Sequence, residues 1–312
     1  MQYCFGVDVG GTTVKMGFFS EEGTLIDNWE IVTRKEESGK YILPDVAASI
    51  EEKLKEHEVA KEDVIGIGIG VPGPVMGDGT VIQCVNLGWG IINVADELQG
   101  MTGIPVRVGN DANVAALGEA WQGGGKGFKD VVMVTLGTGV GGGIILDSKI
   151  LTGTKGAAGE IGHILVNYEE PIACNCGKKG CLEQYASATG IVNEAKRILE
   201  ASPKASTLRD ISPLTAKDIF DCAKEGDELA VDAVNQLCRY LGIALSHVAA
   251  VVDPQAFVIG GGVSKAGTIL TENISKYYDD CVMLALKNKV FRLAELGNDA
   301  GIYGSAKLAL AK

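Results

Sequence analysis

The sequence predicts a two-domain α/β protein in which one structural unit occurs twice. Its 312 residues are more than a single hydrophobic core usually serves. Residues 7–12 (Val-Asp-Val-Gly-Gly-Thr) and 134–139 (Val-Thr-Leu-Gly-Thr-Gly) share one pattern, a strand that runs into a glycine-threonine turn, and they lie 127 residues apart. We therefore expect one phosphate-binding hairpin in each half and a cleft between the halves. Chance similarity of two glycine-rich hairpins is the alternative.

The first half alternates short apolar runs with helical patterns. Residues 3–9 and 14–19 predict the two strands of a hairpin, and residues 24–33 predict a third strand. Residues 44–57 have apolar side chains at helical spacing, with Pro44 near the start. The other elements expected in this half are strands at 65–71 and 106–108 and helices at 94–101 and 112–121.

The second half opens on a similar hairpin. Residues 131–136 predict a strand, 137–143 a glycine turn and 144–146 the returning strand. The apolar side chains of residues 228–252 recur on one helical face. The further elements expected are helices at 184–200, 228–252 and 300–311 and strands at 256–259 and 290–293.

Composition and charge exclude several classes of protein. The net charge is −12, and phosphate neutralisation in nucleic-acid binding needs clustered Lys and Arg, so we expect no nucleic-acid partner. No apolar run reaches the ~18 residues of a membrane span, and the N-terminus does not resemble a signal peptide. We therefore expect a cytoplasmic protein without a membrane partner.

Three glycine clusters predict a nucleotide site. In residues 8–15, Gly10 and Gly11 allow the backbone to approach a phosphate, Asp8 could hold Mg²⁺, and Lys15 could neutralise charge; a plain hairpin turn is the alternative. A second turn spans 136–143, and a third cluster, Gly260–Gly262, suits a nucleotide base or ribose. The chain contains no Walker sequence, so three separate glycine turns predict ATP held between two domains.

Two further residues are candidates for substrate contact. Asp111 follows Asn110 where a strand is expected to run into a helix, and a carboxylate there could accept a hydroxyl proton. Asn and Asp are also common helix caps, which is the alternative. Trp89 either lines the cleft or packs in the core, and we expect the former.

Residues 163–183 predict a zinc site. His163, Cys174, Cys176 and Cys181 complete a tetrahedral ligand set, whereas three unpaired cysteines could also share a loop by chance. A catalytic zinc keeps an open position, so this closed set predicts a structural ion. Glu183 lies two residues beyond the last ligand.

Together these motifs resemble the ROK family of bacterial sugar kinases and regulators, across nearly the whole chain. The cysteine pattern, Cys-x-Cys-Gly-x-x-Gly-Cys-x-Glu, is the family's specific zinc signature. The other matching segments are Asp8–Thr12, Val71–Pro74, Asn86–Trp89, Gly109–Ala115, Leu136–Gly143 and Glu160–His163.

The resemblance implies an actin-like ATPase fold of the hexokinase type, with two α/β domains and an interdomain cleft. The domains are expected at 1–110 plus 298–312 and at 111–297. It also implies ATP-dependent phosphorylation of the 6-hydroxyl of glucose, with Asp111 as the general base. The residues expected at the sugar are Gly73, Asn86, Asn110, Asp111, Glu160, His163 and Glu183. Those expected at ATP and Mg²⁺ are Asp8, Gly10, Gly11, Thr12, Lys15, Gly137, Thr138 and Gly139, with Gly260, Gly261 and Gly262 at the adenosine.

Several alternatives stay open at this point. The acceptor could be another hexose or an N-acetylhexosamine, such as mannose, fructose, allose or N-acetylmannosamine. A ROK sugar sensor without catalysis would resemble this chain but carries an extra N-terminal helix-turn-helix, for which the turn at residue 8 leaves no room. The resemblance also implies a homodimer or homotetramer.

Overall fold

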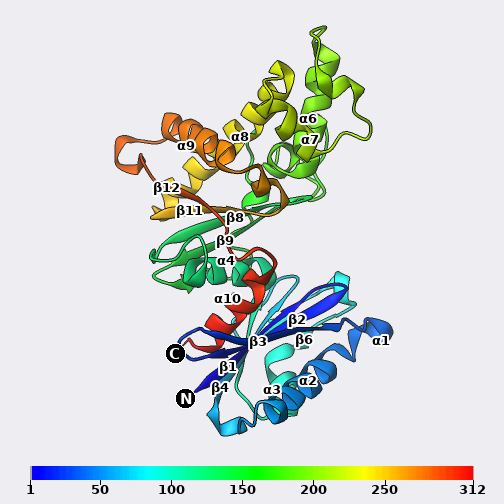
Figure 1. Cartoon of the computed structure of the whole chain (residues 1–312), viewed down its shortest axis with the longest axis vertical. Coiled ribbons are helices and arrows are strands. Elements are labelled where there is room, and N and C mark those ends of the chain that lie inside the picture. The colour runs from blue at the N-terminus through cyan, green and yellow to red at the C-terminus, as the bar shows by residue number, and fades with distance from the viewer. Residues whose placement is uncertain (1, 312) are drawn as a thin grey trace. The chain divides into compact units, whose positions relative to one another are not determined.

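A computed structural model describes residues 2–311 as two compact units. The first unit contains the chain up to residue 127, residues 143–159 and the chain from residue 296 onward. The second contains residues 128–142 and 160–295. Figure 1 follows the chain through both, and the chain passes between them four times.

The first unit is built on a five-stranded sheet of order β3-β2-β1-β4-β7. β1 pairs antiparallel with β2, and β2 with β3, whereas β4 and β7 run parallel to β1. The parallel strands therefore end at one edge, and the register places Asp8 beside Gly70 and Val71 beside Asn110. The strands are β1 (Tyr3–Val9), β2 (Thr13–Ser20), β3 (Leu25–Val32), β4 (Val64–Val71) and β7 (Val106–Asn110).

Helices cover both faces of this sheet. Phe5, Val7 and Val9 alternate along β1 and share a core with α2 (Ile42–Glu56) and α3 (Val94–Thr102). On the opposite face Cys4 and Phe19 pack against α10 (Ala300–Ala309), which Figure 1 shows in red beside β1 and β4. The first unit also contains α1 (Glu36–Gly39), β5 (Thr80–Val81), β6 (Ile92–Asn93) and α4 (Asp111–Gln122).

Close backbone contact explains two glycines in the first sheet. A Cβ on Gly6 would lie 2.0 Å from the Ile302 carbonyl oxygen, and one on Gly68 would lie 1.7 Å from that of Ser305. Only glycine therefore lets α10 lie directly on β1 and β4.

The second sheet repeats the strand order of the first. Its order is β10-β9-β8-β11-β12, with β10 antiparallel to β9 and with β8, β11 and β12 parallel. The hairpin strands and the parallel strands thus hold equivalent places in both sheets, which agrees with a duplicated unit. The strands are β8 (Val131–Leu136), β9 (Val140–Leu146), β10 (Lys149–Ile150), β11 (Ala256–Gly260) and β12 (Val290–Leu293).

The helices of the second unit differ from the sequence prediction at 184–200, and the helices at 216–224 and 268–281 were not predicted. The helix expected at 184–200 is two helices, because the Ser187 side chain accepts the Gly190 N–H and starts a new helix there. The apolar stripe predicted along 228–252 is buried, as expected. The helices are α5 (Glu183–Ala186), α6 (Ala188–Ala201), α7 (Ala216–Lys224), α8 (Glu228–Val252) and α9 (Thr268–Cys281). Within residues 2–311, no helix is long and apolar enough to cross a membrane.

The packing units divide the chain differently from the domains expected at 1–110 plus 298–312 and 111–297. α4 follows that expected limit, yet it packs in the first unit against α10. A Cβ on Gly118 would lie 2.2 Å from the Ala300 carbonyl oxygen, and one on Gly304 would lie 1.7 Å from that of Val114. This glycine contact joins the two helices tightly.

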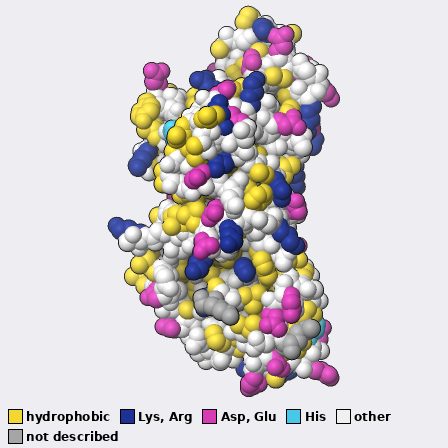
Figure 2. Space-filling model, turned by 90° about the vertical axis from the view of Figure 1, so that its left-hand side faces the viewer, with side chains coloured by type: hydrophobic (Ala, Val, Ile, Leu, Met, Phe, Trp, Pro, Cys, Tyr) yellow, Lys and Arg dark blue, Asp and Glu magenta, His cyan; other side chains and the backbone are white. Residues whose placement is uncertain are grey.

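Charges are mixed on the surface. On the face drawn in Figure 2, Lys and Arg side chains are interspersed with Asp and Glu side chains.

Candidate active site

Two carboxylates of the first unit influence each other at the edge where the parallel strands end. Asp8 lies near the end of β1, and Asp111 is the first residue of α4. The pKa of Asp8 is raised from its ordinary 3.8 to about 6, because burial and the charge of Asp111 raise it more than the charge of Lys15 lowers it. Two acids placed in this way favour a divalent cation nearby.

Asn110 both caps α4 and orients Asp111. Its Oδ1 accepts the N–H groups of Ala112 at 3.1 Å and Asn113 at 3.2 Å. Its Nδ2 donates to the Gly73 carbonyl at 3.1 Å and to Asp111 Oδ1 at 2.9 Å. The capping and the substrate-site interpretations of this dipeptide are thus compatible, because one side chain closes the helix and aims the neighbouring carboxylate.

Asn86 and Trp89 lie between β5 and β6 of the first unit. Asn86 is exposed in a short 3₁₀ helix, Val85–Leu87. Trp89 is only 5% exposed, and its indole N–H donates to the Gly39 carbonyl at 3.1 Å. The expectation that Trp89 forms a wall of the sugar site is wrong, because the indole packs in the core with a polar partner of its own.

The first glycine turn is held by a backbone hydrogen bond and has free space on one side. The Gly10 N–H donates to the Thr13 carbonyl at 3.0 Å, and a Cβ on Gly11 would meet nothing within 4 Å. Thr12 is exposed beside them. The Lys15 Nζ donates to the Asn298 carbonyl of the C-terminal segment at 3.2 Å and forms an ion pair with Asp299 there. It also forms an ion pair with Glu30 of the neighbouring strand β3.

In the second unit Glu183 contacts the second glycine turn. Its Oε2 accepts the Val140 N–H at 3.0 Å, and a Cβ on Gly139 would lie 2.1 Å from the same oxygen. Its Oε1 lies 3.8 Å from Cys174 Sγ. Thr138, Cys174 and Glu183 also line one cavity of about 310 Å³. The fold thus brings the turn, the acid and the cysteine loop together.

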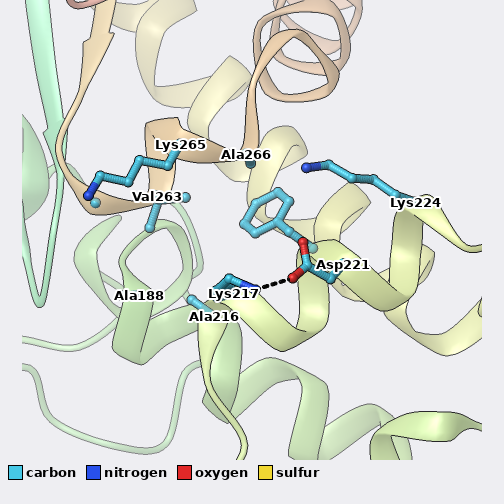
Figure 3. A pocket seen from close by; sticks show the side chains of 10 residues that line it. Ala188, Ala216, Lys217, Asp221, Lys224, Val263, Lys265 and Ala266 are labelled. Atoms are coloured by element: carbon cyan, nitrogen blue, oxygen red, sulfur yellow. Dashed lines mark hydrogen bonds and ion pairs between the residues drawn. The ribbon is translucent and has the colours of Figure 1, made fainter.

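The third glycine cluster packs on the strand that leads into the second turn. Gly261 has φ +82°, and a Cβ there would lie 2.5 Å from the Leu136 carbonyl oxygen. Gly262 lines a cavity of about 210 Å³, whose floor includes the buried Phe220 of α7. Figure 3 shows Lys217 of α7 paired with Asp221 at 2.5 Å, together with Lys224 of the same helix and Lys265 from the turn after β11. The lining lysines are Lys217, Lys224 and Lys265.

Sequence reasoning missed this cavity apart from Gly262. Phe220 occupies an ordinary apolar position of an amphipathic helix, and nothing in the spacing of the lysines separates them from a solvated helix face. We find no sequence signal that would have identified α7 as part of a site.

The four predicted metal ligands converge. The ligand atoms of His163, Cys174, Cys176 and Cys181 all lie within 4.8 Å of one another. Cys174 Sγ lies 3.9 Å from His163 Nδ1, and Cys176 Sγ lies 3.5 Å from Cys181 Sγ. Donors around a tetrahedral zinc are about 3.5–3.8 Å apart, so the residues fit the ion. Gly177 and Gly180, with φ of +83° and +75°, allow the loop to fold around this point.

Glu160 and His163 occupy the two ends of one 3₁₀ turn in the second unit. The His163 N–H donates to the Glu160 carbonyl at 3.1 Å, and both side chains are exposed. Because His163 also faces Cys174, the position of Glu160 is tied to the cysteine loop through three residues of chain.

Comparison with known proteins covers the chain almost completely. A model of the ROK family matches residues 4–312. A glucokinase from Halalkalibacterium halodurans is 44% identical over 308 residues, which cover 97% of this chain and 93% of that protein. An N-acetyl-D-glucosamine kinase from Haemophilus influenzae is 32% identical over 99% of each protein. The solved structure of a ROK family glucokinase from Streptomyces griseus in complex with glucose and AMPPNP is 36% identical, with a TM-score of 0.72 over 98% of both chains. These likenesses confirm the expected actin-like α/β fold.

Proposed function

The chain belongs to the ROK family, and from this premise we propose that it is an ATP-dependent kinase that phosphorylates glucose at the 6-hydroxyl. The observation that carries the proposal is the position of Asp111. Asn110 orients its carboxylate at the start of α4, and its charge raises the pKa of Asp8. The 44% identity with a glucokinase supports glucose as the acceptor.

We propose that Asp111 is the general base. As the 6-oxygen of the sugar bonds to the γ-phosphorus of ATP, the bond to the β,γ-bridging oxygen breaks and Asp111 takes the hydroxyl proton. The products are glucose 6-phosphate and ADP. The two bonds that Asp111 Oδ1 accepts, from Asn110 Nδ2 and the Ala112 N–H, hold the carboxylate in one orientation for this transfer.

Asp8 and the glycine turns are assigned to ATP and its Mg²⁺. The cation supplies positive charge to the transferring phosphoryl group, and its charge also favours the ionised form of Asp8. In the turns Gly10–Thr12 and Gly137–Gly139, the amides of Gly11, Thr12, Thr138 and Gly139 are assigned to phosphate oxygens, because the N–H groups of Gly10 and Gly137 donate to carbonyls within the turns. The cavity beside Gly262 has an apolar floor and a rim of lysines, which suits an adenosine.

The remaining polar residues are assigned to the sugar. Glu160, His163 and Glu183 can hydrogen-bond ring hydroxyls and so discriminate their stereochemistry. The Asn110 amide already makes four hydrogen bonds, so it is assigned to holding Asp111 beside the sugar. Gly73 and Asn86 are placed beside them by the family pattern.

The cysteine loop is assigned to one structural zinc ion. Its four ligands leave no open position for substrate, and Glu183 follows Cys181 by two residues, so the folded loop fixes where Glu183 lies. Reduced thiols in the loop and ATP as donor both suit the cytoplasm.

The test is a comparison of kcat/KM for glucose, mannose, fructose, galactose and N-acetylglucosamine with ATP and Mg²⁺. We expect glucose to lead. The N-acetyl-D-glucosamine kinase that is 32% identical over its full length favours a second candidate, an N-acetylhexosamine. A series led by that sugar would replace glucose but keep the kinase, whereas no transfer to any sugar would overturn the proposed function.

A further inference from the structure

Glu119 is a fully buried acid in the helix that carries Asp111. It lies in the last turns of α4 with 0% of its surface exposed, and acids reach such burial only when their oxygens have partners. Eight residues of helix, about 12 Å, separate it from Asp111. It therefore contacts nothing at the start of α4, and its burial needs another explanation.

Glu119 binds two chain segments that are far apart in the sequence. Its Oε1 accepts the Leu296 N–H at 2.8 Å, and its Oε2 accepts the Gly124 N–H at 2.9 Å. Its own carbonyl accepts the N–H groups of Gly123 at 3.1 Å and Gly125 at 2.9 Å. A Cβ on Gly123 would lie 2.0 Å from Oε2, so this segment is shaped to surround the carboxylate.

Both segments are places where the chain passes between the two units. The chain leaves the first unit after Gly127, just beyond the glycines that Glu119 holds, and it returns at Leu296 itself. One carboxylate therefore joins an outgoing and a returning segment that are 172 residues apart (positions 124 and 296) to the same helix.

We propose that Glu119 is a positioning residue that fastens both crossing segments to α4, and thereby couples their movement to the helix that presents Asp111. This inference rests on the proposed function. When the enzyme closes on its substrates, the segments must move relative to α4 or carry it with them. Two short hydrogen bonds to one buried side chain favour the second course, and α4 then moves with the segments as the site closes and excludes water.

Glu119→Gln tests the link with little change of shape. An amide has one acceptor oxygen, so its NH₂ group faces one of the two N–H donors and that segment loses its partner. We expect hydrogen exchange at Gly124 or Leu296 to accelerate at least about 10-fold, while the amides of residues 114–118 keep their protection. Glu170→Gln is the matched control, because Glu170 is a buried acid of the second unit that accepts the Ile172 N–H. It should leave exchange at both positions unchanged.

Kinetics distinguish a positioning residue from a helix cap. In Glu119→Gln we expect kcat to fall about 10-fold and ATP hydrolysis per glucose phosphorylated to rise. Leu54→Ala, which removes a buried side chain of α2, should lower the stability of the same unit without changing that ratio at a temperature where both variants are folded.

The outcomes are separable. Wild-type protection at both amides in Glu119→Gln would overturn the link, and lost protection with unchanged kcat and hydrolysis would overturn the positioning role. The exchange experiment uses no substrate. A wild-type chain that phosphorylates no hexose would overturn the proposed function, while exchange still decides whether the link exists.

Discussion

Asp8→Asn is expected to stabilise the first unit while it destroys activity. Burial, with Asp111 nearby, raises the pKa of Asp8 from 3.8 to about 6. That rise corresponds to a free energy of at most about 3 kcal/mol, by which folding is weakened when the carboxylate is ionised. Asparagine has nearly the same shape and carries no charge, so the substitution removes this cost.

The pH dependence has a definite sign. The folded state binds the Asp8 proton more tightly than the unfolded state does, so between pH 3.8 and about 6 the folded chain holds more protons. The contribution of Asp8 to stability therefore falls as pH rises through this window, and its cost is fully present above pH 6. The advantage of Asp8→Asn should be large at pH 7.5 and near zero at pH 4.

Tryptophan fluorescence during urea unfolding can measure this, without nucleotide or Mg²⁺. All three tryptophans, Trp29, Trp89 and Trp121, lie in the first unit together with Asp8, so the signal reports that unit. Asp96→Asn, an exposed acid of the same unit, is the control and should change stability by less than about 0.5 kcal/mol. Equal stability of wild type and Asp8→Asn at pH 7.5, or an equal gain at pH 4, would refute the reasoning.

Three further predictions concern catalysis, metal and substrate. Asp111→Asn should keep glucose binding, measured by calorimetry, but its kcat should fall at least about 10²-fold, whereas the kcat of Asp96→Asn should stay unchanged. Near-normal turnover of Asp111→Asn would show that Asp111 is not the general base. Elemental analysis of protein purified without added metal should find about one zinc per chain, lost in Cys176→Ser but kept in Cys281→Ser, an exposed cysteine outside the cluster; active wild type without zinc would contradict this. Galactose should be phosphorylated far less efficiently than glucose, by up to ~10⁴-fold in kcat/KM, because inversion at C4 leaves buried polar groups unpaired; comparable values would show that the C4 hydroxyl is not read.

Local patterns carried most of the fold prediction. The strands at 3–9, 65–71 and 131–136 are short, mostly apolar segments that end at a turn, and the repeated hairpin was visible because its glycines recur in order. The glycine turns, Asn110–Asp111 and the cysteine loop are each contiguous or nearly so. Such motifs can be read without knowing how the chain folds.

Features that depend on contacts between distant residues were not predictable. Glu119 meets Leu296 177 residues later, and no spacing in the sequence indicates that contact. The cavity at Phe220 combines α7 with the turn after β11, two segments that only the fold brings together. Trp89 was wrongly assigned to the sugar site because it belongs to the segment Asn86–Trp89, which matches the family. Its hydrogen-bond partner, the Gly39 carbonyl, lies 50 residues earlier.

The position of α10 has a consequence for synthesis of the protein on the ribosome. β1 and β2 need α10 to cover Cys4 and Phe19, but α10 follows both sheets in the sequence and is made after them. The second unit, whose segments end at residue 295, has its whole sequence available earlier. The N-terminal sheet is thus completed after the second unit. One of its apolar faces stays exposed until a chaperone or the ten residues of α10 cover it. Loss of the C-terminal helix should therefore cause aggregation of newly made chains rather than a folded enzyme of reduced activity.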